Sequence, residues 1–231
     1  MEKQESSVDR IYAQVSEMAA NFEFKPDERI NEGKLAKRLG SSRTPLREAL
    51  NRLVAEGFLK FQTNQGFFCR SLNPKAVFDL YNARQAIETE GIRLAIDSAT
   101  NDEITAIVRF LDETEPEYTS TSSFEKLVEL DESFHIQLVR LSGNFELERI
   151  LENLNARIRF IRQIDMNERR SVTPIAHQRI LAAVLDRDIE KATIELRDHI
   201  SRRREDANIS VQQAFSKLYV PSLNSFPSTP Q

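Results

Sequence analysis

Apolar residues recur every three or four positions along most of the chain, which is the spacing of one face of an α-helix. One helix is expected to begin at a capping box formed by Thr100 and Glu103. Another, the last of the chain, is expected to run from Asp188 to about Leu218. The segment Glu113–Ser123 predicts a loop. The fold class is therefore mainly α, with the other long helices predicted at residues 7–21, 74–98, 124–141, 144–168 and 174–186.

The segment Lys34–Arg52, KLAKRLGSSRTPLREALNR, has the pattern of two short helices joined by a tight turn. Gly40 can adopt the left-handed conformation that ends the first helix, and Pro45 fits the first turn of the second. Ser42 or Thr44 is expected to cap that second helix. The segment therefore predicts a helix-turn-helix.

Two short, aromatic-rich segments follow. Phe58–Gln62 and Phe67–Arg70 are predicted to be strands on either side of a turn at residues 63–66. A hairpin after a helix-turn-helix makes a winged helix-turn-helix domain, which we place at residues 1–72. Residues 73–220 show no strand pattern and predict an all-α helical bundle, and residues 221–231 predict a disordered tail.

Polar side chains on the second helix of this motif are candidates for contacts with DNA. Arg43 and Arg47 are four residues apart, so they project side by side from the end of a helix that enters the major groove. The planar fork of arginine matches guanine O6 and N7, and Thr44 can donate to a phosphate. A solvated helix face is the alternative for the two arginines. Further candidate DNA contacts are Lys34 and, in the wing, Lys60, Asn64, Gln65 and Gly66.

The distribution of charge favours nucleic acid more than its total does. The chain has 32 basic and 36 acidic residues and a net charge of −4. Residues 34–70 hold eight basic side chains against two acidic ones, so this window is +6 and the remainder is −10. A local basic surface on an acidic protein attracts phosphate at that surface.

Several classes of protein are not expected. No apolar run approaches the roughly 20 residues of a membrane span, and the first residues lack the apolar core of a signal peptide, so we expect a cytoplasmic protein without a membrane partner. The single cysteine, Cys69, excludes an internal disulfide framework and a cysteine-cluster metal site.

All three histidines lie in the predicted bundle. Asp131 and His135 fall one turn apart within an apolar arc, and His177 and His199 lie in or beside the apolar stripes of later helices. Such a set suits a divalent metal held inside a helix bundle. Ligand type does not choose among Zn²⁺, Ni²⁺, Mn²⁺ and Fe²⁺, with Zn²⁺ our first expectation. The alternative is a metal-free hydrogen-bond network.

The stretch LGSSRTPLREALNRLVAEGFL, followed by NQGFF, resembles the DNA-binding domain of GntR regulators in the branch named after the fatty-acid regulator FadR. The resemblance covers about residues 8–72 and implies DNA contacts from Arg43, Thr44, Arg47 and Gly66. The sequence departs from the family at Gly33, a position that is often basic. The phosphate contact that the resemblance implies at this position is not one that a glycine side chain supplies.

The motifs DESFH, AHQRIL and LRDHI resemble the FCD effector domain that follows the winged helix in this branch. The resemblance implies that Asp131, His135, His177 and His199 bind a metal that helps to bind a small carboxylate effector, and that two such domains pair in a homodimer. NARQAIE resembles a family stretch whose arginine lies near the pocket, so Arg84 is the candidate for the effector carboxylate. A surface salt bridge is the alternative for Arg84.

Three functions follow from these patterns. We expect a transcription regulator rather than an enzyme, typically a repressor in this branch, whose homodimer binds a pseudo-palindromic operator and responds to a small organic acid. The second function is a metal-dependent hydrolytic enzyme, although four protein ligands leave little open coordination and Glu132, the nearest carboxylate, points off the apolar arc. The third is a DNA-binding protein with a purely structural metal.

Overall fold

The structure is a computed structural model that describes residues 6–201 and 204–220. By their contacts these residues fall into two compact units. One unit contains the chain up to Asn73 together with the end of the last helix from Val211, and the other is Pro74–Ser210. The predicted tail lies outside the described residues, and the domain limits at residues 72 and 220 stay predictions.

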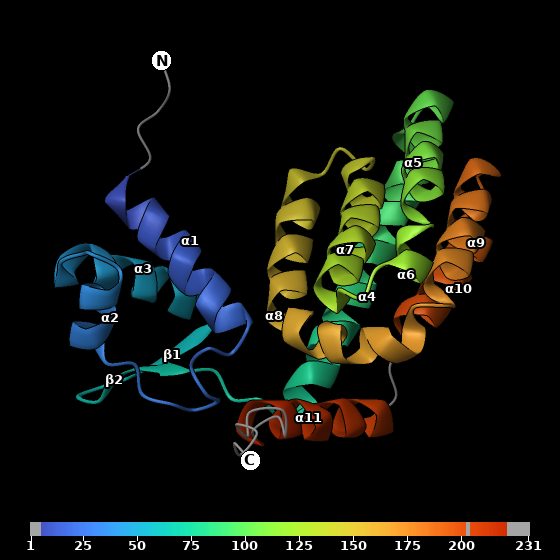
Figure 1. The fold of residues 1–231 in the computed structure, drawn as a ribbon. Coiled ribbons are helices and arrows are strands. Elements are labelled where there is room, and N and C mark those ends of the chain that lie inside the picture. The colour runs from blue at the N-terminus through green and yellow to red at the C-terminus, as the bar shows by residue number, and fades with distance from the viewer. Residues whose placement is uncertain (1–5, 202–203, 221–231) are drawn as a thin grey trace, which may run out of the picture. The chain divides into compact units, whose positions relative to one another are not determined.

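The first unit is a winged helix, as predicted. Its strands pair antiparallel, with Leu59 opposite Cys69 and Gln62 opposite Gly66, and both lie within one residue of the predicted segments. Asn64 and Gly66 have positive φ angles of 63° and 94°, which close the turn of the wing. The elements (Figure 1) are α1 (Ser7–Ala20), α2 (Glu32–Arg38), α3 (Arg43–Ala55), β1 (Leu59–Gln62) and β2 (Gly66–Cys69).

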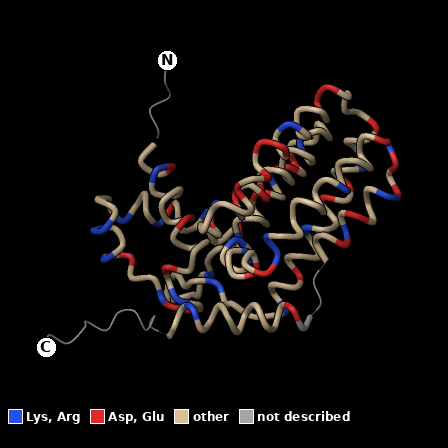
Figure 2. The backbone as a smooth tube through the Cα atoms, turned by 45° about the vertical axis from the view of Figure 1, so that its right-hand side comes forward, with Lys and Arg blue, Asp and Glu red and all other residues tan. Residues whose placement is uncertain are grey.

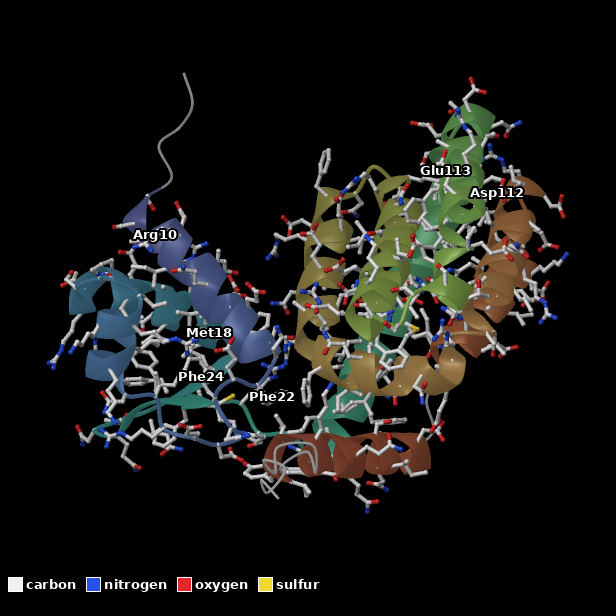
Figure 3. The ribbon with its side chains drawn as sticks, in the orientation of Figure 1. Arg10, Met18, Phe22, Phe24, Asp112 and Glu113 are labelled. Carbon is white, nitrogen blue, oxygen red and sulfur yellow. The ribbon has the colours of Figure 1, made fainter. Side chains whose placement is uncertain are left out.

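The core of this unit lies between α1 and α3, which pack together. Both helices contribute fully buried aliphatic side chains, and Met18 and Phe22 extend the core at the end of α1 (Figure 3). Gly40 has the predicted left-handed conformation, with φ 59°. Ser42 occupies the N-cap position of α3, as predicted, but its side chain makes no capping hydrogen bond.

The second unit is a helical bundle arranged around α4 (Pro74–Ser98), and it contains no strand among the described residues. The central helix contacts four others, and its buried residues, from Val77 to Ile96, recur at helical spacing on one face, while Arg93 and others on the opposite face are exposed. None of the helices described is long and apolar enough to cross a membrane. The other helices are α5 (Asn101–Thr114), α6 (Glu117–Ser120), α7 (Phe124–Arg140), α8 (Phe145–Arg169), α9 (Thr173–Leu185), α10 (Ile189–Ile200) and α11 (Arg204–Tyr219), of which α11 belongs to this unit only up to Ser210 (Figure 1).

Two segments of the bundle differ from the sequence prediction. The predicted loop at residues 113–123 contains the short helix α6, because Tyr118 is buried in an apolar cluster with α7. The predicted last helix is two helices, since the backbone leaves the helical region at Ser201, where ψ is 135°. Ile200 and Ala207 are both buried and seven residues apart, which is also the spacing of an unbroken helix. The apolar pattern therefore gives no sign of the break.

Gly91 sets the approach of α4 to α7. A Cβ atom at this position would lie 2.9 Å from Cγ2 of Val139, a fully buried residue of α7. Gly91 comes one turn after Glu88, and Val139 comes one turn after His135. The close approach therefore brings Glu88 within reach of His135.

The substitution Gly91→Ala is expected to destabilise the protein. Alanine gains up to about 1 kcal/mol over glycine inside a helix, but overpacking a core typically costs about 1–3 kcal/mol, and the stiff valine side chain leaves little room to adjust. Thermal unfolding measures the sign. In a Val139→Ala background, which removes the clash, the same change should become neutral or stabilising. A Gly91→Ala protein more stable than wild type would contradict this packing.

Candidate metal centre and nucleic-acid interface

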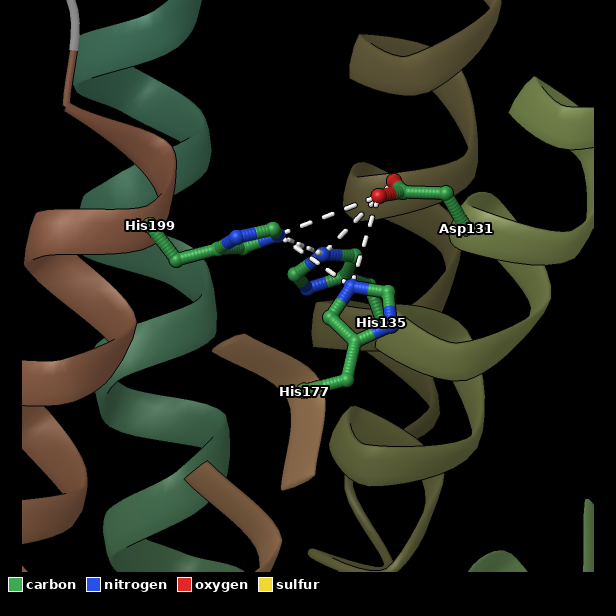
Figure 4. A group of neighbouring side chains, drawn as sticks. All are labelled: Asp131, His135, His177 and His199. Atoms are coloured by element: carbon green, nitrogen blue, oxygen red, sulfur yellow. Dashed lines mark hydrogen bonds and ion pairs between the residues drawn. The ribbon is translucent and has the colours of Figure 1, made fainter. Parts of the chain in front are cut away.

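Asp131 and His135 of α7, His177 of α9 and His199 of α10 converge inside the bundle (Figure 4). One ligand atom from each lies within 4.8 Å of all the others. His199 Nε2 lies 3.1 Å from His135 Nε2 and 3.2 Å from His177 Nε2. Asp131 Oδ1 lies 3.3 Å from His177 Nε2. Three helices thus bring together all four residues that the sequence singled out.

Glu88 holds His135 from the side opposite the cluster. The distance from His135 Nδ1 to Glu88 Oε2 is 2.5 Å, and Arg84 Nε donates to the other carboxylate oxygen, Glu88 Oε1, at 2.5 Å. With its proton on Nδ1 and donated to Glu88, His135 presents the lone pair of Nε2 to the cluster. The sequence analysis missed Glu88. Its only sign in the sequence is its position four residues after Arg84 on the same helix face.

The protonation states of these groups favour metal binding. Burial lowers the pKa of His135, and burial together with neighbouring histidines holds the pKa of His177 and of His199 well below the ordinary value. Burial opposes the ionisation of Glu88, but Arg84 and His135 outweigh it and lower the pKa of Glu88 to about 2. At neutral pH the imidazoles are therefore neutral and Glu88 is charged.

Three imidazole nitrogens and one carboxylate oxygen that face one another fit a cation. Each neutral ring has one N–H, and His135 uses its own at Glu88, so its Nε2 faces the other ring nitrogens as a lone pair. Around an ion with bonds of about 2.1 Å in tetrahedral geometry, neighbouring ligand atoms lie about 3.4 Å apart, close to the spacings found here. The donor set fits Zn²⁺, Ni²⁺, Mn²⁺ or Fe²⁺.

Two buried arginines lie beside Asp131. Arg162 Nη2 forms an ion pair with Asp131 Oδ2, and Arg84 Nη2 lies 3.9 Å from the same oxygen. Arg84 is only 3% exposed, so the alternative of a surface salt bridge is wrong: its partner Glu88 is buried with it. Arg162 was not identified from the sequence, because nothing in the sequence places its helix, α8, against Asp131.

Glu132 is buried, whereas the sequence analysis expected it to point away from the apolar arc. Arg159 Nη2 donates to Glu132 Oε2 at 2.6 Å, and Arg162 Nη1 lies 3.4 Å from Glu132 Oε1. The physical reason is that α8 packs along α7 and covers the side on which Glu132 lies. Both of its carboxylate oxygens are engaged, so Glu132 is not a free base for water activation.

A small polar pocket opens beside the cluster. Its walls include Arg84, Asp131, Arg162 and His199, together with Tyr81 from α4. Its free volume is about 30 Å³, which is the share of one water molecule in the liquid. The guanidinium of Arg162 lies in its wall, against Asp131.

A larger concavity of about 580 Å³ lies between α3 and the wing. Arg43, Arg47 and Gln65 line it, and so do Gly33 and Arg29. Thr44, Lys34 and Asn64 are exposed but do not line it, and Gly66 lies at the turn of the wing.

Arg47 is held in place within this concavity. Its Nη1 donates to both carboxylate oxygens of Glu32 at 3.0 Å, and its guanidinium lies 5.5 Å from the ring centre of Phe67. The arginine thus has two protein partners, whereas an arginine on a simple solvated helix face would have none. Glu32 was not among the residues that the sequence analysis singled out.

Lys and Arg positions of the winged helix are interspersed with Asp and Glu positions along the backbone (Figure 2). Not every basic residue of the window at residues 34–70 contributes to the concavity. Arg70 is buried and donates to the carbonyl of Ala19 at 2.7 Å. Arg52 pairs with Asp9 at 2.9 Å, and Lys60 pairs with Asp27 at 3.2 Å. The charge count therefore overstates the free positive charge of the winged helix.

Each of the two units matches the model of a known protein family. The model "Bacterial regulatory proteins, gntR family" matches residues 7–69, and the model "FCD domain" matches residues 79–202, more than half of the chain. The chain belongs to the GntR family. It is a DNA-binding transcriptional regulator with an FCD domain, as the sequence motifs predicted.

Several relatives extend over nearly the whole chain. The Nta operon transcriptional regulator of Aminobacter aminovorans is 39% identical over 208 residues, which cover 90% of this chain and 98% of that protein. The uncharacterized HTH-type regulator YdhC of Bacillus subtilis is 35% identical over 83% of this chain and 87% of its own. Among solved structures, Escherichia coli McbR/YncC has a TM-score of 0.71 and 21% identity, with 90% of this chain and 98% of that chain covered, which shows a shared fold.

Proposed function

We propose that this GntR regulator binds a divalent metal through Asp131, His135, His177 and His199, and that a small carboxylate bound beside the metal changes its affinity for operator DNA. We further propose that it acts as a homodimer on a pseudo-palindromic operator, as a repressor that the effector releases. The recognition surface would comprise Arg43, Thr44 and Arg47 of α3, with Lys34, Asn64 and Gly66 around them.

The balance of charge around the cluster supports an anionic effector. Among the described residues that line the pocket or pair with its walls, three arginines (Arg84, Arg162 and Arg169) stand against four carboxylates (Glu88, Asp131, Glu132 and Asp165). Arg159, the second partner of Glu132, brings the balance to zero. A divalent cation adds a charge of +2 to a site shielded from water, where unbalanced charge is costly. One or two carboxylate groups offset that charge.

Arg162 and Arg84 are the proposed donors to the effector. Asp131 Oδ2 is paired with Arg162 Nη2 in the pocket wall, and this nitrogen would be available to a carboxylate if Asp131 held a metal ion instead. Arg84 Nη2 is buried without a hydrogen-bond partner and lies in the same wall. Two guanidinium groups can hold a carboxylate by paired hydrogen bonds. A bound divalent ion would supply Lewis acidity and a further coordination position for a carboxylate oxygen.

Thermal unfolding with a panel of small acids tests the proposal. Monocarboxylates, hydroxy acids and dicarboxylates should raise the melting temperature of metal-loaded protein to different degrees. The best acid should add about 2.7 kcal/mol to the free energy of unfolding at one hundred times its Kd. The matching amides should have no effect. The best acid should also change DNA binding. Equal stabilisation of metal-free protein, or no response to any acid, would contradict the proposal.

Arg84→Lys is the matched variant for this experiment. Lysine keeps the positive charge beside Glu88 but loses the planar fork of arginine. We expect normal metal content with an acid response at least several-fold weaker. A metal that stabilises wild type with no acid response at all would instead favour a purely structural ion.

A further inference from the structure

The concavity between α3 and the wing carries positive charge that no group among the described residues neutralises. Among its lining residues, the cations are Arg29, Arg43 and Arg47, and the one carboxylate is Glu32. Glu32 forms an ion pair with Arg47, with 3.0 Å between Glu32 Oε2 and Arg47 Nη1. Arg29 and Arg43 form no ion pair or side-chain hydrogen bond with any residue that the structure describes. Two exposed guanidinium groups therefore face one open space.

The backbone of Arg29 is fixed to the base of the wing. Arg29 forms an antiparallel bridge with Phe68 of β2. On either side of it, Ile30 N donates to the carbonyl of Phe67 at 2.8 Å and Cys69 N donates to the carbonyl of Glu28 at 2.9 Å. The segment around Arg29 thus pairs with β2 on the edge of the hairpin, as a short third strand would. A side chain that starts from this edge can reach a ligand without ordering a loop.

Gly33 leaves room in the same concavity. A Cβ atom built at Gly33 would lie 3.5 Å from Arg43 Nη2, an ordinary van der Waals contact. The position therefore accepts a side chain, and the glycine is not required by packing. The basic side chain that the family often has at this position is absent here, but Arg29 lines the same space from the neighbouring edge.

We propose that Arg29 binds a phosphate of the DNA backbone in this concavity, beside Arg43, and supplies the contact that Gly33 lacks. The inference rests on the proposed DNA surface of α3 and the wing. An unpaired guanidinium next to a recognition helix matches phosphate oxygens, which accept hydrogen bonds bidentately. A backbone contact adds affinity for every sequence and carries no base preference.

Binding to a mixed-sequence duplex of about 30 base pairs, followed by fluorescence anisotropy across a salt series, tests the inference. Arg29→Ala should weaken binding several-fold and reduce the slope of log K against log salt by about 0.9 per bound protomer. Arg93→Ala is the matched control, because this exposed arginine of α4 pairs with Glu90 at 2.7 Å in the other unit, and it should leave the slope unchanged.

A second variant tests the location of the contact. Gly33→Lys combined with Arg29→Ala should regain the lost slope, because the new charge enters the same space. A double variant that regains nothing, an unchanged slope in Arg29→Ala, or an effect confined to one selected sequence would each overturn the inference. Arg47→Ala, measured alongside, separates the two proposals. If it weakens binding and Arg29→Ala does not, only the phosphate contact is wrong, whereas two unaffected variants would contradict the whole surface.

Discussion

His177→Ala is expected to abolish metal retention while leaving the DNA affinity of the effector-free protein essentially unchanged. The side chain is fully buried, its Nε2 lies 3.2 Å from that of His199, and its ring stacks on Phe134 with centres 3.9 Å apart. Loss of one of the four converging ligand atoms would leave the proposed ion with three protein ligands. Metal content of the purified protein and the rise in melting temperature on adding Zn²⁺ measure the effect, and metal retained at the wild-type level would contradict it.

Glu88→Gln supplies a graded comparison for that experiment. Glutamine keeps the shape of Glu88 but removes the charge that orients His135. Partners of this kind typically change metal affinity by about 10–100-fold, so we expect weaker binding rather than complete loss. Wild-type affinity in Glu88→Gln would show that the carboxylate has no part in orienting the imidazole. His177→Gln is the control for His177→Ala, because the larger glutamine side chain leaves less of a cavity beside Phe134. Loss of metal in both variants would show that the missing imidazole, and not a cavity, is the cause.

Arg47→Ala is expected to weaken operator binding by about 1–3 kcal/mol and to relax the base preference at one position of each half-site, if the arginine donates to a guanine. Glu32 and the ring of Phe67 hold the guanidinium before DNA arrives, so little ordering remains to be paid on binding. An operator selected from random duplexes, and versions with single base changes, provide the measurement. Unchanged affinity and unchanged base preference would remove Arg47 from the interface.

Glu32→Gln separates the orientation of Arg47 from its charge. This variant keeps Arg47 but weakens the ion pair that holds it and removes a negative charge from the proposed DNA surface. Binding to unrelated DNA should therefore become stronger, while the preference for the selected operator over unrelated DNA should fall. A preference equal to that of wild type would show that Glu32 does not position the arginine.

The sequence predicted those parts of the molecule that depend on local pattern. Helical spacing, Gly40 and the aromatic hairpin predicted the winged helix, and the position of Asp131 and His135 inside one apolar arc predicted their burial. The break at Ser201 could not be predicted, because the apolar spacing from Ile200 to Ala207 continues through it without glycine or proline.

The remainder of the site could not be predicted, because it depends on which helices pack together. Arg84 and Glu88 have the four-residue spacing of an ordinary surface ion pair, and only the central place of α4 in the bundle buries them. Arg162 comes from α8, and nothing in its own sequence neighbourhood points to Asp131. The free positive charge expected for the winged helix was too high for a related reason, since a count of basic residues cannot show that Arg70 is buried in the core.

The most direct test of the metal centre is a crystal structure with anomalous diffraction data collected at the absorption edges of zinc, nickel, iron and manganese. We predict one anomalous peak within about 2.0–2.2 Å of a carboxylate oxygen of Asp131 and of Nε2 of His135, His177 and His199. The edge at which the peak appears identifies the metal. The contrary result is no peak after soaking with each ion in turn, with His135 and His177 still within hydrogen-bond distance of His199. It would contradict the central claim and leave a metal-free histidine network.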